Sequence, residues 1–218
     1  MVSVVLLMAG KGSRMGAETN KVLLPLGNRL MFEYPLQLFL RLGCEVVCVI
    51  SKEDEEKIKA KLPEAVKYTY GGSTRQESVR NGLNLCTASY VLIHDAARAL
   101  LDEKTVKEII KISSSGEAVL VYQEVKDTIK QVCGERLQTL PRNTLISAAT
   151  PQSAPLSVMK EVHWRAYEES WETTDDISLI EKYRPDIKIN LVLSNAENFK
   201  ITTPLDYKLA KLLAEVEK

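Results

Sequence analysis

Histidines and paired cysteines are scarce in this 218-residue chain, and their scarcity excludes several kinds of active site. Only two histidines are present, His94 and His163, so a zinc cluster or a Ser-His-Asp triad has little to be built from. No two cysteines form a CxxC pair, which favours free thiols over a metal or redox site. The cysteines are Cys44, Cys48, Cys86 and Cys133. The P-loop pattern G-x-x-x-x-G-K-[ST] is also absent.

An excess of charge and long apolar runs are lacking as well. The chain has 29 Lys and Arg against 29 Asp and Glu, whereas nucleic-acid and anionic membrane surfaces call for a basic excess. The apolar start, residues 2–8, is too short to span a bilayer and lacks the charged leader and cleavage site of a signal peptide. We therefore expect a cytoplasmic protein with no nucleic-acid or membrane partner.

Apolar runs that alternate with helix-like stretches dominate what is present. This alternation predicts one α/β domain over residues 1–218, with a mostly parallel sheet and helices on both faces. The expected strands are residues 4–7, 45–50, 68–70, 90–93, 118–122 and 187–193. The expected helices are residues 31–42, 53–62, 75–85, 103–113, 156–168, a segment opened by Asp175-Asp176, and 206–216.

The pattern changes at about residues 125–148. Two alternating segments, 125–132 and 137–146, flank a polar Gly134-Glu135 turn, which predicts a β-hairpin or arm. An arm that projects from an α/β body has few ways to bury its apolar face alone. We therefore expect a partner subunit to pack against it.

The loop after the first strand is the first candidate binding site, because ligands of open α/β sheets bind beyond the carboxyl ends of the strands. Gly10 and Gly12 would let main-chain N–H groups approach phosphate oxygens. Arg14 supplies a charged fork and Lys21 an ammonium, and together they suit a polyphosphate. A plain glycine turn with two solvated cations is the alternative.

Two further loops follow strand-like runs. Residues 71–79, Gly-Gly-Ser-Thr-Arg-Gln-Glu-Ser-Val, could contour a flat base, although a helix N-cap by Ser73 or Thr74 explains them nearly as well. Asp95 ends the strand at residues 90–93, and a carboxylate beside a polyphosphate is a natural Mg²⁺ ligand. The alternative there is a capping Asp with a surface Arg98. The doublet Asp175-Asp176 is interpreted as a helix cap rather than a metal site.

The order of these motifs resembles the 2-C-methyl-D-erythritol 4-phosphate cytidylyltransferase family over nearly the whole chain. The motifs are Met8-Ala9-Gly10-Lys11-Gly12-Ser13-Arg14-Met15 with Lys21, residues 71–79, His94-Asp95-Ala96-Ala97-Arg98, Val125-Lys126-Asp127-Thr128, Thr150-Pro151-Gln152, Thr174-Asp175-Asp176 and Phe199-Lys200-Ile201-Thr202. The resemblance implies a Rossmann-like nucleotidyltransferase fold, a homodimer made by exchanged β-arms and a Mg²⁺-dependent reaction. In that reaction the phosphate of the acceptor attacks the α-phosphate of CTP and displaces pyrophosphate.

The resemblance also implies roles for individual residues. Arg14 and Lys21 would be catalytic, Asp95 would take the metal, and a third set would bind the nucleotide. That set is Met8, Ala9, Gly10, Gly12, Gly72, Ser73, Ser78, Ala96 and Arg98. The acceptor would contact Thr150, Thr174 and Lys200 of one subunit, with Thr128 and Arg142 from the neighbour's arm.

Three departures from the family pattern and three alternatives stay open. Asn20 and Ala99 stand where prolines are usual, and Met8 where alanine is commoner. Since loss of a proline relaxes the backbone, Asn20 could change how firmly Lys21 is presented.

The alternatives are a cytidylyltransferase for another polyol phosphate such as ribitol 5-phosphate, a sugar-1-phosphate nucleotidyltransferase, and a non-catalytic nucleotide-binding protein. Four charges at one sheet edge, Arg14, Lys21, Asp95 and Lys200, argue against the last.

Overall fold

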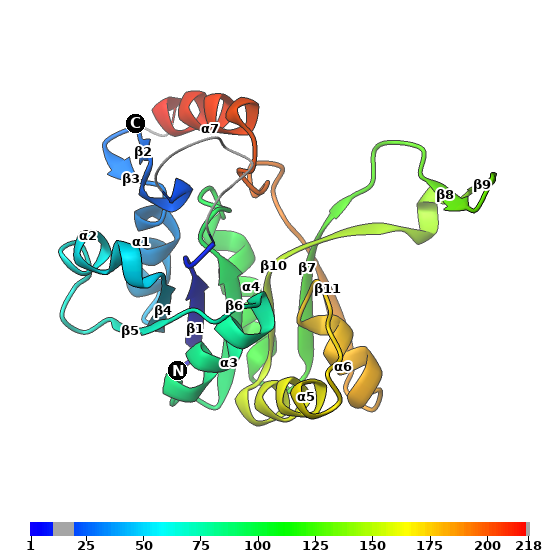
Figure 1. Cartoon of the computed structure of the whole chain (residues 1–218), viewed down its shortest axis with the longest axis horizontal. Coiled ribbons are helices and arrows are strands. Elements are labelled where there is room, and N and C mark those ends of the chain that lie inside the picture. Colours follow the sequence, from blue (N-terminus) through cyan, green and yellow to red (C-terminus); the bar gives the residue numbers. More distant parts are fainter. Residues whose placement is uncertain (11–19, 217–218) are drawn as a thin grey trace.

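The computed structural model describes residues 1–10 and 20–216, which form one α/β body and a projecting arm (Figure 1). The elements in chain order are β1 (Ser3–Leu7), η2 (Lys21–Leu23), β2 (Pro25–Leu26), β3 (Arg29–Leu30), α1 (Glu33–Arg41), β4 (Glu45–Ile50), η3 (Lys52–Asp54), α2 (Glu55–Lys59), β5 (Lys67–Tyr70), α3 (Arg75–Leu85), β6 (Tyr90–Asp95), α4 (Glu103–Ser113), β7 (Ala118–Glu124), β8 (Lys130–Cys133), β9 (Arg136–Thr139), η4 (Arg142–Thr144), β10 (Ile146–Pro155), α5 (Leu156–Glu168), α6 (Ile177–Tyr183), β11 (Ile189–Leu193) and α7 (Pro204–Val216).

A seven-stranded sheet in the order β11-β7-β10-β6-β1-β4-β5 forms the centre of the body. Every pairing in it is parallel except those of β10, which runs antiparallel to β6 and to β7. The expected fold class is thus confirmed. The register pairs Leu7 of β1 with Asp95 of β6, so these two strands end side by side at one edge.

Helices cover both faces of the sheet. Successive strand residues point to opposite faces, so apolar residues of one strand can pack against helices on both sides. On one face Val4 and Leu6 of β1 join a core cluster with helices α1 and α4. On the other face Val5 joins helices α3, α5 and α6. Helix α3 approaches β1 closely: a Cβ at Gly82 would lie 2.5 Å from the side chain of Val5. A glycine at this position therefore lets α3, and the loop that precedes it, lie close to the end of β1.

A third cluster covers the sheet edge where β6 ends. Ala97, Ala99 and Leu100 pack there with Ala210 and Ala214 of α7, and α7 lies across this end of the body in Figure 1. Ala99 is only 3% exposed, so the position at which the family pattern has proline is filled by a core alanine. This cluster fixes the segment that follows Asp95.

Strands β8 and β9 form a two-stranded sheet at the tip of the arm, which extends from the long strands β7 and β10 (Figure 1). Arm residues between Lys126 and Arg142 are almost all exposed, including the apolar side chains Val132 (71%) and Leu137 (69%). The second predicted segment, residues 137–146, is divided in the structure. Strand β9 ends at Thr139, and Pro141 precedes the short helix η4.

The main difference from the expected elements is β10, a strand in the middle of the sheet that the sequence did not predict. It contains Pro151 and Pro155, and prolines are usually confined to edge strands or bulges because they donate no ladder hydrogen bond. The register against β7 shifts between Ala148 and Gln152, and Pro151 lies within that irregularity. Helix α2 is also shorter at both ends than the expected residues 53–62: residues 52–54 form the 3-10 helix η3, and α2 ends at Lys59.

Candidate functional site

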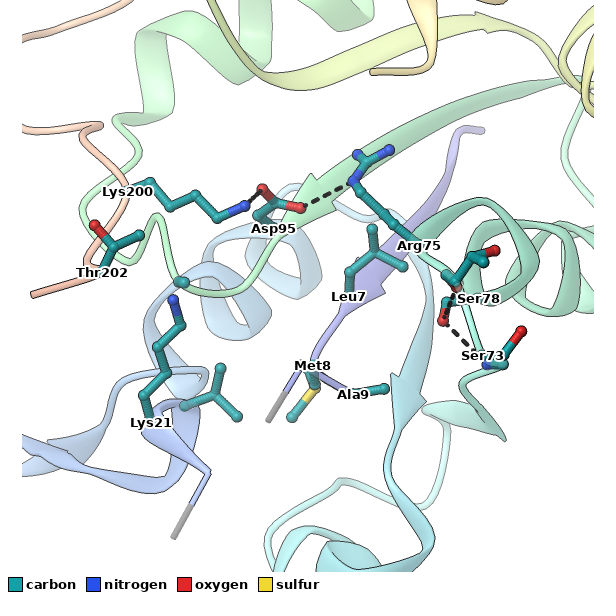
Figure 2. Close-up of a pocket in the computed structure, with 15 residues that line it drawn as sticks. Leu7, Met8, Ala9, Lys21, Ser73, Arg75, Ser78, Asp95, Lys200 and Thr202 are labelled. Carbon is teal, nitrogen blue, oxygen red and sulfur yellow. Dashed lines mark hydrogen bonds and ion pairs between the residues drawn. The ribbon is translucent and has the colours of Figure 1, made fainter. Parts of the chain in front are cut away.

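A cavity of about 450 Å³ lies at the sheet edge where β1 and β6 end. Its lining combines the end of β1, the start of η2, the loop before α3 and the segment at residues 200–202. Figure 2 shows Lys21 on one side of the cavity and Ser73 on the other, with Met8 and Ala9 between them. Of the predicted nucleotide-binding residues, the lining contains Met8, Ala9, Gly10, Gly72, Ser73 and Ser78. The predicted residues Gly12 and Arg14 lie outside the described residues.

The loop before α3 is held by local hydrogen bonds. Thr74 caps the helix by accepting from the N–H of Glu77 at 3.1 Å, in agreement with the alternative cap interpretation. Ser78 Oγ accepts from the N–H of Gly72 at 3.1 Å and donates to the carbonyl of Thr74 at 2.9 Å. A Cβ at Gly71 would lie 2.5 Å from the Cβ of Ala9, so glycine permits this loop to pack on the end of β1. The two nucleotide motifs therefore form one continuous wall.

Asp95 lies between two cations at the end of β6. Lys200 Nζ is 2.7 Å from its Oδ2, and Arg75 Nε is 3.7 Å from its Oδ1 (Figure 2). Burial raises the pKa of Asp95, but Arg75 and Lys200 outweigh it, so that the pKa lies below its ordinary value. The carboxylate is therefore ionised at neutral pH, at the lining of the cavity.

Lys21 points along one side of the cavity toward the residues that follow β11 (Figure 2). Its Nζ donates to the carbonyl of Ile201 at 2.8 Å, and Thr202 lines the cavity beside it. Lys21 and Lys200, which are far apart in the sequence, thus lie at the same cavity. An anionic ligand there would meet two ammonium groups, an arrangement that suits a polyphosphate.

A second cavity, of about 500 Å³, adjoins the first. Three charged residues line both cavities: Arg75, Asp95 and Lys200. The predicted acceptor residues Thr150, Thr174 and Lys200 line the second cavity. Arg98, which was predicted to bind the nucleotide, lines this cavity and not the first. The site therefore offers two adjacent ligand volumes with Asp95 at their junction.

The Thr150 hydroxyl is engaged in hydrogen bonds within the protein, one of them to the backbone of Asp95. Its Oγ1 accepts from the N–H of Asp95 at 3.1 Å and lies 3.0 Å from His94 Nδ1, while His94 Nε2 lies 3.1 Å from the carbonyl of Arg98. Burial lowers the pKa of His94 to about 4, so the ring is neutral at pH 7. A neutral ring that donates through Nε2 to a carbonyl must accept at Nδ1. The Thr150 hydroxyl therefore donates to His94, and its proton is already used.

Several predicted residues are not brought to these cavities. Ala96 is fully buried, its N–H donates to the carbonyl of Leu7 at 3.0 Å, and it lines neither cavity. Thr128 and Arg142 are exposed on the arm, where Arg142 donates to the carbonyl of Lys126 at 2.7 Å, and they also line neither cavity of their own chain. A role for Thr128 or Arg142 at a site accordingly requires another chain.

A buried ion pair behind the second cavity was not predicted. Arg75 binds both carboxylate oxygens of Asp176 at 2.9 and 2.8 Å, and His163 Nε2 lies 3.2 Å from the same carboxylate. Asp176 is fully buried and stands at the N-cap position of α6, but its side chain makes no capping hydrogen bond; instead Asp175 accepts from the N–H of Ser178 at 3.1 Å. The cap interpretation was thus right for Asp175 and wrong for Asp176. Arg75 lies in a recognised motif, but no local pattern indicates a partner 101 residues away.

Among residues 1–10 and 20–216, no group of three or more His, Cys, Asp or Glu side chains is placed to hold a metal ion. Among the described residues that line the first cavity, Asp95 supplies the single carboxylate. No helix in the part of the chain that the structure describes combines the length and the apolar character needed to cross a membrane.

Comparison with known proteins gives a consistent result. The family model for 2-C-methyl-D-erythritol 4-phosphate cytidylyltransferase (IspD) matches residues 2–215. The enzyme of that name from Prochlorococcus marinus (strain NATL2A) is 38% identical over 224 residues, covering 99% of each chain, and that from Clostridioides difficile is 34% identical, covering 100% of this chain and 95% of the relative. The crystal structure of 4-diphosphocytidyl-2C-methyl-D-erythritol synthase from Anaerococcus prevotii superposes with a TM-score of 0.87 at 27% identity, covering 99% and 98% of the two chains. That of the Thermus thermophilus cytidylyltransferase superposes with a TM-score of 0.80 at 29% identity, covering 99% and 100%.

Proposed function

Because the chain belongs to the 2-C-methyl-D-erythritol 4-phosphate cytidylyltransferase family, we infer that it transfers CMP from CTP to 2-C-methyl-D-erythritol 4-phosphate. The products are 4-diphosphocytidyl-2-C-methyl-D-erythritol, an intermediate of non-mevalonate isoprenoid synthesis, and pyrophosphate. The observation that supports this reaction best is the pair of adjoining cavities that share Arg75, Asp95 and Lys200. Two substrates bound there would meet at a charged junction.

The nucleotide occupies the first cavity in this proposal. The backbone at Met8, Ala9 and Gly10, together with the loop at Gly72 and Ser73, contacts the cytosine ring. Lys21, with Arg14 from outside the described residues, holds the triphosphate and stabilises the charge that builds up at the α-phosphorus. Nucleotidyl transfer needs mainly positioning and charge neutralisation, since the attacking phosphate oxygen is already an anion. The bond from the α-phosphorus to the bridging oxygen breaks as the new P–O bond forms.

The acceptor occupies the second cavity, beside Thr174, Lys200 and Arg98. Lys200 reaches Asp95 from this side, so an acceptor phosphate that binds Lys200 would lie close to the nucleotide. Thr150 contributes differently from the expectation, because its hydroxyl supports the end of β6 through Asp95 and His94. The neutral His94 ring takes no part in proton transfer, in keeping with a reaction that needs no base.

Asp95 would hold the Mg²⁺ ion. A single carboxylate fits this metal, which is usually bound through one or two carboxylates together with substrate phosphates and water. Bound Mg²⁺ would neutralise charge on the phosphates of CTP. Lys200 and Arg75 contact the same carboxylate, which keeps it ionised and holds it at the cavity.

A homodimer completes the acceptor site in this proposal. Thr128 and Arg142 are exposed on the arm and line neither cavity of their own chain, and the arm also exposes Val132 and Leu137. A second copy that receives the arm would bury these apolar side chains and supply Arg142 to the partner's acceptor. We place the enzyme in the cytoplasm, where the unpaired thiols Cys44, Cys48 and Cys86 stay reduced.

The experiment that tests the function measures pyrophosphate release with CTP and Mg²⁺. Methylerythritol 4-phosphate, ribitol 5-phosphate and glucose 1-phosphate are compared as acceptors under the same conditions. We expect rapid release with the first alone. Release with ribitol 5-phosphate or glucose 1-phosphate alone would keep the mechanism and change the substrate, and no release with any acceptor would contradict the proposed activity.

A further inference from the structure

Asn20 is a buried amide directly before Lys21, and its side chain makes three hydrogen bonds. It is 8% exposed. Its Nδ2 donates to the carbonyl of Met8 at 2.7 Å and to Oδ2 of Asp54 at 2.9 Å, while its Oδ1 accepts from the N–H of Val22 at 3.3 Å. Both partners of Nδ2 are acceptors only, so the orientation of the amide is fixed by chemistry. Asn20 therefore joins three separate segments.

The partners of Asn20 are themselves held in place. The N–H of Met8 donates to the carbonyl of Val49 at 2.8 Å, which fixes the end of β1 against β4. Asp54 Oδ2 also accepts from Ser51 Oγ at 2.6 Å, within the turn that follows β4. Met8 and Asp54 are held at the ends of β1 and β4. The hydrogen bonds of Asn20 to these two residues therefore fix the start of η2 relative to the sheet edge. The first residue of η2 is Lys21.

Lys21 depends on this attachment. Its ammonium lies at the end of a long flexible stem, so the position of the Lys21 backbone sets which part of the cavity the ammonium can reach. Its Nζ donates to the carbonyl of Ile201. We propose that Asn20 is a positioning residue, which fixes the backbone of Lys21 relative to the nucleotide cavity through the Met8 carbonyl and Asp54. The proposal rests on the proposed function, in which Lys21 stabilises the charge at the α-phosphorus of CTP.

The test compares Asn20→Ala with a matched control. Small displacements of a charge donor reduce rate strongly, so Asn20→Ala should lower kcat roughly tenfold to a hundredfold and leave the acceptor KM unchanged. The control is Asn190→Ala. Asn190 Nδ2 also donates to a carboxylate, Glu117 at 2.8 Å, and to a carbonyl, Ala118 at 3.3 Å, but at the opposite end of the sheet. Asn190→Ala should lower the unfolding temperature similarly and keep kcat.

A double-mutant cycle with Lys21→Ala separates positioning from general stability. If Asn20 acts through Lys21, Asn20→Ala should cost no further kcat in the Lys21→Ala background. The same loss in both backgrounds, or a normal kcat for Asn20→Ala, would overturn the inference. Asp54→Ala, which removes the carboxylate that accepts from Asn20 Nδ2, replaces Asn20→Ala in the cycle if the latter fails to fold.

CTP affinity provides a readout that does not depend on turnover. Calorimetry is carried out on the wild-type protein, Asn20→Ala, Lys21→Ala and the double variant. It should show that Asn20→Ala weakens CTP binding only when Lys21 is present. If the wild-type enzyme released no pyrophosphate with any acceptor, the proposed function would fail, while this binding cycle would still decide the role of Asn20. Additive losses in CTP affinity would contradict the positioning role.

Discussion

Asp95 and its cations show how much of the site depends on single side chains. Lys200 at 2.7 Å and Arg75 at 3.7 Å approach opposite oxygens of the same carboxylate, and each comes from a different segment of the chain. Arg75 also forms an ion pair with Asp176, so two carboxylates hold its guanidinium in place. Because Arg75 and Lys200 line both cavities, the proposed function predicts that a substitution at either residue affects the nucleotide and the acceptor together.

At this scale the clearest prediction concerns the cations of the nucleotide cavity. Lys21→Ala and Arg14→Ala should each reduce kcat by about a hundredfold or more, the scale of losing one preorganised charge donor. Steady-state pyrophosphate release measures the effect. Lys104→Ala, which removes an exposed lysine on α4, serves as the control. A near-normal kcat in both variants would refute the assigned role of these residues.

Glu45 at the start of β4 joins several elements at the other end of the sheet. Its carboxylate accepts from Lys67 Nζ of β5 at 2.6 Å, from the N–H and hydroxyl of Thr87 at 2.9 and 2.8 Å, and from Ser3 of β1. Burial raises its pKa, but the hydrogen bonds from Lys67, Ser3 and Thr87 outweigh burial and lower the pKa from 4.5 to about 2. The ionised form thus ties β1, β4, β5 and the loop after α3 together.

The element scale therefore predicts a pH dependence of stability. A carboxylate whose pKa is lower in the folded state stabilises the fold above its unfolded pKa. The contribution of Glu45 should be complete above about pH 4.5 and should be lost as the pH falls toward about 2. Glu45→Gln should lower the free energy of unfolding at pH 7 by roughly 1–3 kcal/mol. Urea unfolding of both proteins at pH 7 and pH 3 measures this.

The difference between the wild-type protein and Glu45→Gln should be smaller at pH 3 than at pH 7. At pH 3 the Glu45 carboxyl of the unfolded protein, with its ordinary pKa of 4.5, is already protonated, so ionisation in the folded state stabilises the fold less. Kinetic parameters at neutral pH should stay close to those of the wild-type enzyme, since Glu45 lies at the opposite end of the sheet from the cavities. A difference in unfolding free energy that does not change with pH would show that the charge of Glu45 is not what stabilises these contacts.

At the scale of the whole molecule, the arm leaves apolar and charged side chains exposed. Its exposed residues include Val132 of β8 and Arg142 of η4, so a lone subunit leaves apolar surface and a cation in water. An isolated two-stranded hairpin is marginally stable at best, and burial against a second subunit would stabilise it. In the proposed dimer, the acceptor site depends on the partner whereas the nucleotide cavity does not.

The prediction at this scale is that a monomer separates the two substrates. Val132→Asp with Leu137→Asp should shift the protein to a monomer in sedimentation experiments. The acceptor KM should rise about tenfold or more, as expected for loss of an interface residue that contacts the ligand, while CTP affinity is retained. The matched control is Leu205→Asp with Leu212→Asp on α7, two leucines of similar exposure (74% and 63%) outside the arm. A monomer with an unchanged acceptor KM would contradict the role of Arg142.

Local pattern was enough to predict most elements, and the exceptions have identifiable causes. Helix α3 and strand β4 have the predicted bounds, because the Thr74 cap and the apolar run at residues 45–50 are local signals. Strand β10 was missed because Pro151 and Pro155 argue against a central strand. For the site, the lining of the first cavity contains six of the predicted nucleotide residues, whereas Ala96 is buried outside it.

The sequence by itself determined the kinds of element, the polar residues at the strand ends and the family, because periodicity and ordered motifs are properties of neighbouring residues. Only the tertiary structure decided which of those residues meet. Arg75 finds Asp176 101 residues away, and Lys21 reaches Ile201 180 residues away. The cause is the strand order, which places β10 between β6 and β7 and brings distant loops to one edge. Asn20 shows the same division: its place before Lys21 is in the sequence, but its bonds to Met8 and Asp54 exist only in the folded chain.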